Sequence, residues 1–453
     1  MGSRRRSFTT FTLAAFILGC VALAHAYTLQ YTDGTAALRI KWPTTTIKVA
    51  LSSSLNSPPS NIKHGSDVLG AVRRALARWS EAANIQFVEV SSDALSVSPS
   101  GQGDHVSLIT IADTPENRAV FDNADRTGRT RVFYDPLTGA IAEADVVINP
   151  ATQFSTDGTS ETYDLEATFT HEIGHFLGLE HSSEAGSAMQ PRQGINGLYE
   201  QAALSPRTLS DDDHTGARAL YGPREGFGNI GGRVSDAEGA VASGAHVWAE
   251  DIKTGKVVAG SASLPDGSYR IESLPPGEYR LVADRAGETH AQLKVNAGET
   301  ALHDVTIGGG AATLNPQVFG SNGQLSTVAV PVSRSRRYTI FVGGAGVDQV
   351  PSAGISVASP FIKVKPASLT LQSGVNYEHP IISFDVEVGA DAPLGDYSIL
   401  LQSRTGEYAY LPGALTVDSA SGEQSPDGRA GGAAFTAQAL SLFNVLLTAP
   451  PAL

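Results

Sequence analysis

Three histidines, one glutamate and one glycine stand at fixed spacing near the middle of the chain, in a segment that reads H-E-x-x-H-x-x-G-x-x-H. His171 and His175 are four residues apart, so on an α-helix both rings project from the same face and can bind one ion. Gly178 predicts the end of that helix, because glycine adopts the left-handed conformation without a steric penalty. The reversal would bring His181 to the same ion.

The residue types indicate what such an ion would do. Three neutral imidazoles around Zn²⁺ leave a fourth coordination position open for water, which is typical of a catalytic site. Glu172 lies beside the ligand face, where its carboxylate can act as a general base toward that water without becoming a ligand. The spacing therefore predicts a hydrolytic centre with one catalytic zinc ion.

This pattern resembles the metzincin metallopeptidases, and within them the matrixins, the matrix metalloproteinase-like group. Ser182 follows the third histidine, as in matrixins. Met189, within Ser187-Ala188-Met189-Gln190-Pro191, is similar to the Met-turn that underlies the zinc site, and Pro191 would help to shape the substrate pocket. The resemblance implies an endopeptidase whose pocket wall is formed by the loop from Arg192 to Pro206.

A second similarity to matrixins lies downstream. Leu209-Ser210-Asp211-Asp212-Asp213 leads to Ala219-Leu220-Tyr221-Gly222, which resembles the C-terminal helix of matrixin catalytic domains. In that reading Asp212 and Asp213 are structural and tie the helix to the Met-turn. The implied fold is an α+β catalytic domain over residues 27–222, with a mixed twisted sheet and an active-site helix.

The chain also departs from the animal matrixins. It has one cysteine, Cys20, which lies in an apparent export signal, so the mature chain has no thiol to block the zinc. Asp33-Gly34 is a weak candidate for another latency device and is more typical of a turn. The residues that hold a second, structural zinc are not recognisable. Calcium stays possible, with Asp122, Asp125 and Asp135 as candidate ligands.

The N-terminus predicts export. Three arginines precede an apolar run, and Ala24-His25-Ala26 is typical of a signal-peptide cleavage site, so residues 1–26 are expected to be removed. Ile17-Leu18-Gly19-Cys20 leaves open a lipid anchor at Cys20 on a bacterial cell surface. The mature chain is expected to be secreted and to contain no transmembrane helix.

Within the catalytic region, strands are predicted at Thr46 to Ser52, Ile85 to Val90 and Val106 to Ile111, and a helix is expected to begin with Ser66 as its cap. That helix would bury Val68, Val72, Leu76 and Trp79 on one face. The alternating stretch from Ala140 to Ile148 resembles the edge strand along which matrixins bind an extended substrate.

Beyond Gly222 the pattern changes to short strands and dense turns. Asp266-Gly267-Ser268-Tyr269 and Leu274-Pro275-Pro276-Gly277-Glu278-Tyr279 resemble the carboxypeptidase regulatory-like domain, a small β-sandwich placed here at 228–309. A second all-β unit, immunoglobulin-like, is predicted at 310–418, where the turn at 392–397 is expected to close a hairpin. Residues 419–453 read as a flexible linker and an apolar tail.

The net charge and the remaining histidines limit the range of functions that we expect. The net charge is −14, and it becomes −17 without residues 1–26, which hold three arginines and no acid, so nucleic-acid binding is not expected. Seven other histidines are scattered and are expected to be surface or hydrogen-bonded residues: His64, His105, His214, His246, His290, His303 and His379.

The sequence predicts a secreted zinc endopeptidase that hydrolyses peptide bonds of extracellular proteins. The alternative is a secreted or surface-anchored binding or adhesion protein in which the β-domains act and the metal site is vestigial.

Overall fold

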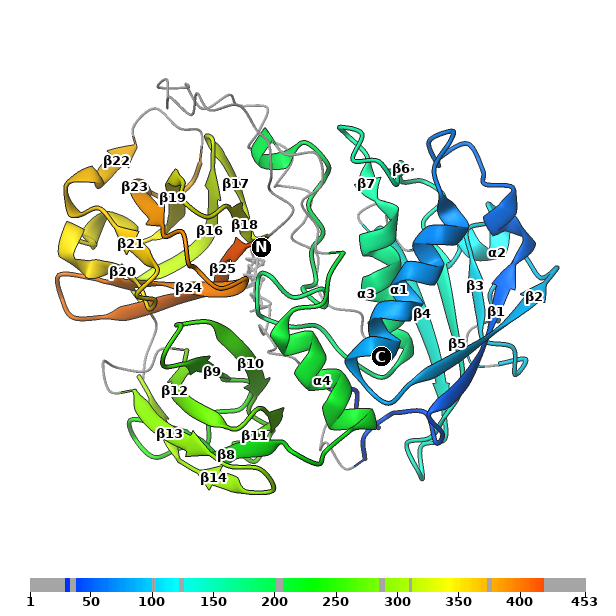
Figure 1. Ribbon diagram of the computed structural model, residues 1–453, viewed down its shortest axis with the longest axis horizontal. Helices are drawn as coiled ribbons and strands as arrows, with labels where there is room; N and C mark the ends of the chain where they lie inside the picture. Colours follow the sequence, from blue (N-terminus) through cyan, green and yellow to red (C-terminus); the bar gives the residue numbers. More distant parts are fainter. Residues whose placement is uncertain are drawn as a thin grey trace, which may run out of the picture.

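The computed structural model describes residues 29–32, 38–99, 101, 103–121, 126–200, 207–284, 290–308, 312–372 and 377–418. The predicted signal segment with Cys20, the pair Asp33-Gly34, two of the three candidate calcium ligands and the predicted tail lie outside the described residues. We use the names N-terminal unit for residues 38–222, middle unit for 228–308 and C-terminal unit for 312–418. Figure 1 shows the N-terminal unit on the right and the two β-rich units on the left.

A five-stranded sheet forms one layer of the N-terminal unit, in the order β2-β1-β3-β5-β4. The first four strands in this order run parallel and β4 runs antiparallel to β5. The strands are β1 (Thr46–Ser52), β2 (Gln86–Ser92), β3 (Leu108–Thr110), β4 (Gly128–Tyr134) and β5 (Ile141–Ile148), and a small pair is made by β6 (Phe154–Ser155) and β7 (Tyr163–Asp164).

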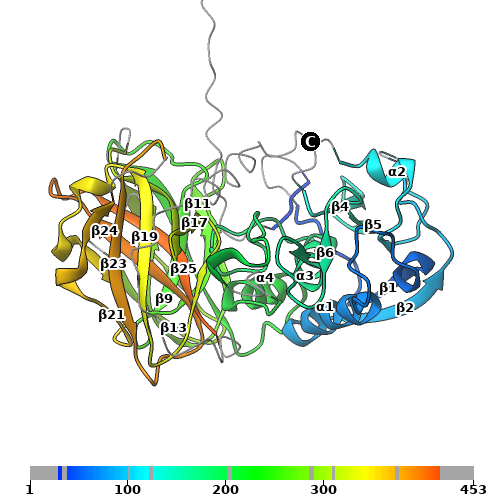
Figure 2. The same ribbon diagram turned by 90° about the horizontal axis from the view of Figure 1, so that it is seen from above.

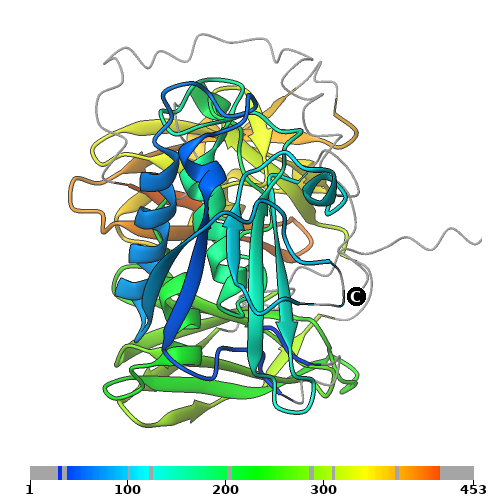
Figure 3. The ribbon, with the colours of Figure 1, turned by 90° about the vertical axis from the view of Figure 1, so that its right-hand side faces the viewer.

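The helices of this unit are α1 (Val68–Ala82), α2 (Pro115–Arg118), α3 (Leu165–Phe176) and α4 (Asp211–Tyr221), with short 3₁₀ turns at Ser53–Asn56 and Leu198–Glu200. The four apolar residues expected on one face of α1 are all buried, and α1 packs against α3. Trp79 donates its indole N–H to the carbonyl of Thr170 at 2.8 Å, which fixes the two helices in register. Figure 3 shows α1 beside the sheet, seen from the N-terminal unit.

Two predictions for this unit were wrong. The cap of α1 is Asp67, whose carboxylate accepts a hydrogen bond from the amide of Gly70, and Ser66 lies one residue before it. The stretch at 140–148, which forms β5, does not lie at the edge of the sheet, because it pairs with β3 on one side and with β4 on the other. The edge strand is β4, whose sequence GRTRVFY carries two arginines and no simple alternation, so periodicity did not reveal it.

The middle unit consists of two packed sheets, in the orders β10-β9-β12-β13 and β11-β8-β14, with β15 also pairing with β8. Its strands are β8 (Gly228–Asp236), β9 (His246–Asp251), β10 (Val257–Ala262), β11 (Ser268–Leu274), β12 (Gly277–Ala283), β13 (Ala291–Val295), β14 (Thr300–Leu302) and β15 (Val305–Ile307). Helix α4 packs on β10 and β11, so the apolar cores of the first two units are continuous. Figure 2 shows α4 between the N-terminal sheet and the β-rich units.

The C-terminal unit also has two sheets, β17-β16-β19-β23-β21 with β22 on β23, and β18-β25-β24-β20. Its strands are β16 (Asn315–Ser321), β17 (Gln324–Ser326), β18 (Val330–Val332), β19 (Arg337–Ala345), β20 (Ile355–Val357), β21 (Ile362–Val364), β22 (Thr370–Gln372), β23 (Ile381–Val388), β24 (Gly395–Gln402) and β25 (Tyr408–Val417), with 3₁₀ turns at Val347–Gln349, Ser352–Gly354 and Pro366–Ser368.

The prediction of a hairpin at 392–397 is wrong. The strands on either side of this turn belong to different sheets, so the turn carries the chain across the sandwich. Within the described residues, no helix is both long and apolar enough to cross a bilayer.

Candidate metal centre and active site

The helix that carries the motif has strong signals at both ends. Asp164 caps α3 by accepting the amide of Ala167 at 2.9 Å, and Glu166 in the first turn forms ion pairs with Arg74 and Arg78 from α1. Acidic groups at this end also suit the positive end of the helix dipole. The helix ends before Gly178, whose φ is +96°. A Cβ there would stand 2.2 Å from the carbonyl oxygen of Ile40, so only glycine fits.

The three motif histidines converge. Their ring centroids are 4.7, 4.8 and 5.4 Å apart, and their nitrogens lie within 4.8 Å of one another. His171 Nδ1 lies 2.8 Å from the carbonyl of Ala188, and His175 Nδ1 lies 2.8 Å from that of Leu179. A carbonyl only accepts, so both Nδ1 atoms carry the proton and both Nε2 lone pairs are available to a metal.

All three motif histidines are half-buried. Burial lowers the pKa of His171, with the neighbouring His175 adding to the effect, so its ring stays neutral. His181 is more exposed, and its Nδ1 lies 3.4 Å from Glu180 Oε1. Three neutral imidazoles fit Zn²⁺, which takes nitrogen ligands and needs deprotonated ones. Among the described residues this is the one cluster of three potential ligands.

Glu172 lies beside this centre and against the edge strand β4. Its Oε2 accepts a hydrogen bond of 2.6 Å from the hydroxyl of Thr130, and only 4% of the residue is exposed. Burial raises the pKa of Glu172, while the hydrogen bond from the side chain of Thr130 opposes that shift. A Cβ at Gly128 would lie 2.8 Å from Glu172 Cγ, so β4 approaches the carboxylate closely because that residue is glycine.

Met189 lies under the helix. It is buried, and its Sδ lies 2.1 Å from the position a Cβ on Gly174 would take, next to the ring of Trp79. Its backbone carbonyl accepts a hydrogen bond of 2.8 Å from the amide of Ser182. This bond holds the Met-turn beside the residue that follows His181.

Asp212 and Asp213 of α4 accept hydrogen bonds from residues in and before the Met-turn. Asp213 Oδ1 accepts the hydroxyl of Ser187 at 2.6 Å, and its Oδ2 accepts the amide of Ala188 at 2.8 Å. Asp212 accepts the hydroxyl of Ser182 at 2.7 Å. The carbonyl that fixes the ring of His171 thus belongs to a residue held by Asp213.

Other predicted residues lie apart from the centre or serve other purposes. Pro191 is exposed after the Met-turn. Asp135 is an exposed turn residue between β4 and β5, and its oxygens accept from Leu137 and Thr138 within that turn. His246 is neither at the surface nor hydrogen-bonded through Nε2; it is buried, 3.3 Å from Glu184.

Two contacts, made by Thr130 and by Tyr199, were not predicted from the sequence. Thr130 touches Glu172 from a strand that the periodicity did not reveal. Tyr199, in the loop implied to be a pocket wall, lies inside the core of the C-terminal unit. Both depend on pairing between distant segments.

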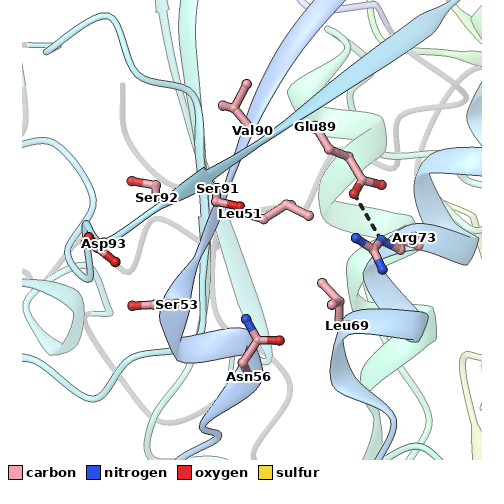
Figure 4. A pocket seen from close by; sticks show the side chains of 10 residues that line it. All are labelled: Leu51, Ser53, Asn56, Leu69, Arg73, Glu89, Val90, Ser91, Ser92 and Asp93. Carbon is pink, nitrogen blue, oxygen red and sulfur yellow. Dashed lines mark hydrogen bonds and ion pairs between the residues drawn. The ribbon is translucent and has the colours of Figure 1, made fainter.

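A separate pocket lies at the other edge of the sheet, between β2 and α1 (Figure 4). An ion pair of 3.0 Å between Arg73 and Glu89 closes one side of it. None of the predicted site residues lines it, so it is not the candidate centre.

Residues 41–222 match the family model of the matrixins, and residues 229–308 match that of the carboxypeptidase regulatory-like domain. The chain therefore contains a matrixin domain followed by a carboxypeptidase regulatory-like domain.

Individual relatives agree over the same region. Metalloendoproteinase 1-MMP of Arabidopsis thaliana is 32% identical over 35% of this chain and 38% of its own length. Metalloendoproteinase 1 of Glycine max is 30% identical over 34% of this chain and 45% of its own. Interstitial collagenase of Oryctolagus cuniculus is 28% identical over 35% of this chain and 29% of its own. The chain thus matches less than half the length of these relatives.

Proposed function

We propose that this protein is a secreted zinc endopeptidase that cleaves extracellular proteins. The convergence of three imidazoles beside the buried carboxylate of Glu172 carries this proposal. The matrixin match supports a zinc-dependent peptidase in general terms, and the residue roles and export are our proposal. Bound at His171, His175 and His181, Zn²⁺ would lower the pKa of a water and polarise a carbonyl oxygen.

The chain's own groups then have separable roles. Glu172 accepts a proton from the attacking water and can return it to the leaving amine. Thr130 orients the carboxylate through Oε2. Among the described residues β4 pairs with β5 alone, and its other side can pair with an extended peptide, which would bring a scissile bond alongside Glu172.

The test is Glu172→Ala in the full chain. We expect zinc content to stay at one ion per chain and casein cleavage to fall by roughly 10²- to 10⁴-fold, since the base is lost while the ligands remain. Glu225→Ala, at an exposed position, is the control and should leave both unchanged.

Metal removal gives an independent check. Dialysis against a zinc chelator should abolish cleavage, and added Zn²⁺ should restore it. Undiminished cleavage by the metal-free protein would refute the proposal. A protein that binds zinc without cleaving any protein would favour the binding or adhesion alternative.

A further inference from the structure

The segment after the Met-turn runs along the helix that carries the metal ligands. Ala188 contacts the ring of His171, Gln193 Oε1 accepts the hydroxyl of Thr168 at 2.8 Å, and the amide of Asn196 donates to Thr162 at 2.9 Å. As this segment proceeds, its partners move back along the chain from 171 to 162. It is therefore antiparallel to α3 and flanks the metal centre.

The far end of this segment is inserted into the C-terminal unit. Tyr199 is 1% exposed and belongs, with Leu198, to the apolar core of that unit. Its hydroxyl lies 3.1 Å from the carbonyl of Val328 and 3.2 Å from that of Phe319. Gly320 leaves room for the ring, because a Cβ there would lie 2.9 Å from Tyr199 Cε1.

The backbone of Tyr199 is held from both sides. Its amide donates to the side-chain oxygen of Gln324, and its carbonyl accepts the side-chain amide of Asn322 at 3.0 Å. Both partners lie at the turn between β16 and β17. Tyr199 has a φ of 53° and Glu200 a φ of 61°, conformations that residues other than glycine rarely adopt. Such a conformation persists only where surrounding contacts impose it.

The near end of the segment is fixed to the same unit. The side-chain amide of Gln190 donates to the carbonyl of Thr327 at 2.9 Å. Ala185, which precedes the Met-turn, donates its amide to the carbonyl of Pro412, and its carbonyl accepts the amide of Ala329. The chain from Ala185 to Tyr199 is thus held between α3 on one side and the C-terminal unit on the other.

We infer that the C-terminal unit sets substrate selectivity, by holding the segment from Gln190 to Tyr199 as one wall of the substrate site. Tyr199 is the positioning residue, and it acts through the segment rather than on substrate. The substrate site is then composite, and the N-terminal unit alone lacks the support of that wall. This inference rests on the proposed peptidase function.

The first readout needs no activity. Hydrogen exchange of the full chain would compare wild type with Tyr199→Ala, Tyr199→Phe and Asn322→Ala. We expect the amides of Asn196 and Leu198 to exchange about tenfold faster or more in Tyr199→Ala and Asn322→Ala, with α1 unchanged. Tyr199→Phe, which keeps the ring, should retain most of the protection. Asn315→Ala, exposed on β16, the strand that leads to Asn322, is the matched control and should match wild type.

The second readout is selectivity. Two fluorogenic peptides would differ only in the residue after the scissile bond, alanine in one and leucine in the other. Tyr199→Ala and Asn322→Ala should change the ratio of their kcat/KM values by about fivefold or more, with zinc content unchanged, and Tyr199→Phe should largely restore it.

The outcomes separate the two proposals. Unchanged exchange in both variants, or faster exchange with an unchanged ratio, overturns the inference. If wild type cleaves neither peptide nor casein, the peptidase proposal and the selectivity inference both fall, whatever the exchange shows. If Tyr199→Ala fails to fold, Asn322→Ala decides the question alone.

Discussion

At the scale of single residues, the metal centre depends on side chains outside the motif. Ala188 orients His171 through its carbonyl, and Asp213 holds Ala188 through its amide. The same carboxylate also accepts the amide and hydroxyl of Ser210, which caps α4. One buried carboxylate therefore completes the capping box of α4 and supports the Met-turn.

Asp213→Asn should weaken zinc binding without touching a ligand. The substituted amide presents N–H groups to at least one of these donors, so the turn that carries Ala188 loosens. We expect zinc affinity to fall by roughly 10- to 100-fold, as for other groups that orient metal ligands. Competition with a chromophoric chelator measures this. Asp391→Asn, at an exposed position, is the control, and equal affinities in the two variants would contradict the role of Asp213.

At the scale of elements, the position of His181 depends on where α3 ends. Gly178 turns the chain sharply, and the following residues return to the metal centre. The antiparallel edge strand β4 supplies the opposite support through Thr130. The end of α3 thus places His181, and the edge strand β4 independently supports Glu172.

Gly178→Ala should disturb the helix end and His181 together. The φ of +96° disfavours alanine, and its Cβ would meet the backbone of Ile40 at 2.2 Å. We expect a loss of roughly 2 kcal/mol or more in the free energy of unfolding, measured in urea, together with weaker zinc binding. Gly231→Ala is the control, since its Cβ would meet only ordinary contacts of 3.4 Å and beyond. A Gly178→Ala protein as stable as that control would argue against this account.

At the scale of the whole molecule, the three units meet around buried acids at the start of α4. Glu184 lies 3.3 Å from His246 of the middle unit, and Asp212 accepts the amide of Gly260 at 2.8 Å. Asp396 of the C-terminal unit is buried against Gly186 and accepts the hydroxyl of Thr416. Burial raises the pKa of Glu184, Asp212 and Asp396, the last to about 7, and lowers that of His246 to about 4.

These shifts predict that the assembled chain is less stable at mildly alkaline pH. The folded state keeps protons on the three acids that the unfolded chain releases above its ordinary pKa of 3.8 to 4.5, so stability falls as pH rises from those values to each raised pKa, which is about 7 for Asp396. His246 has the opposite effect between about 4 and 6.5 and none above. Each acid therefore lowers stability by up to about 1.4 kcal/mol per pH unit between its ordinary pKa and its raised folded pKa, and the contribution of Asp396 ends near pH 7.

Urea unfolding between pH 5 and 7 measures this slope. Asp396→Asn should reduce it, because the amide keeps the Thr416 contact and cannot ionise, while Asp391→Asn should not. Identical slopes in both variants would show that Asp396 titrates normally.

Much of the candidate site followed from the sequence, because its signals are local. The helical spacing of His171 and His175 and the glycine at 178 act within a few residues of one another. The apolar face of α1 and the turns of the middle unit are local in the same sense. The matrixin resemblance drawn from these motifs is confirmed by the family match over residues 41–222.

Tertiary structure decided what depends on pairing between distant segments. Which strand lies at the sheet edge was predicted wrongly, because alternation in one strand does not reveal what pairs beside it. The turn at 392–397 was misread for the same reason, since a turn joins strands of one sheet or of two. The burial of His246 beside Glu184, and of Tyr199 in another unit's core, needed the docked units. The local motif determined the ligand set of the candidate metal centre, and long-range packing determined what surrounds it.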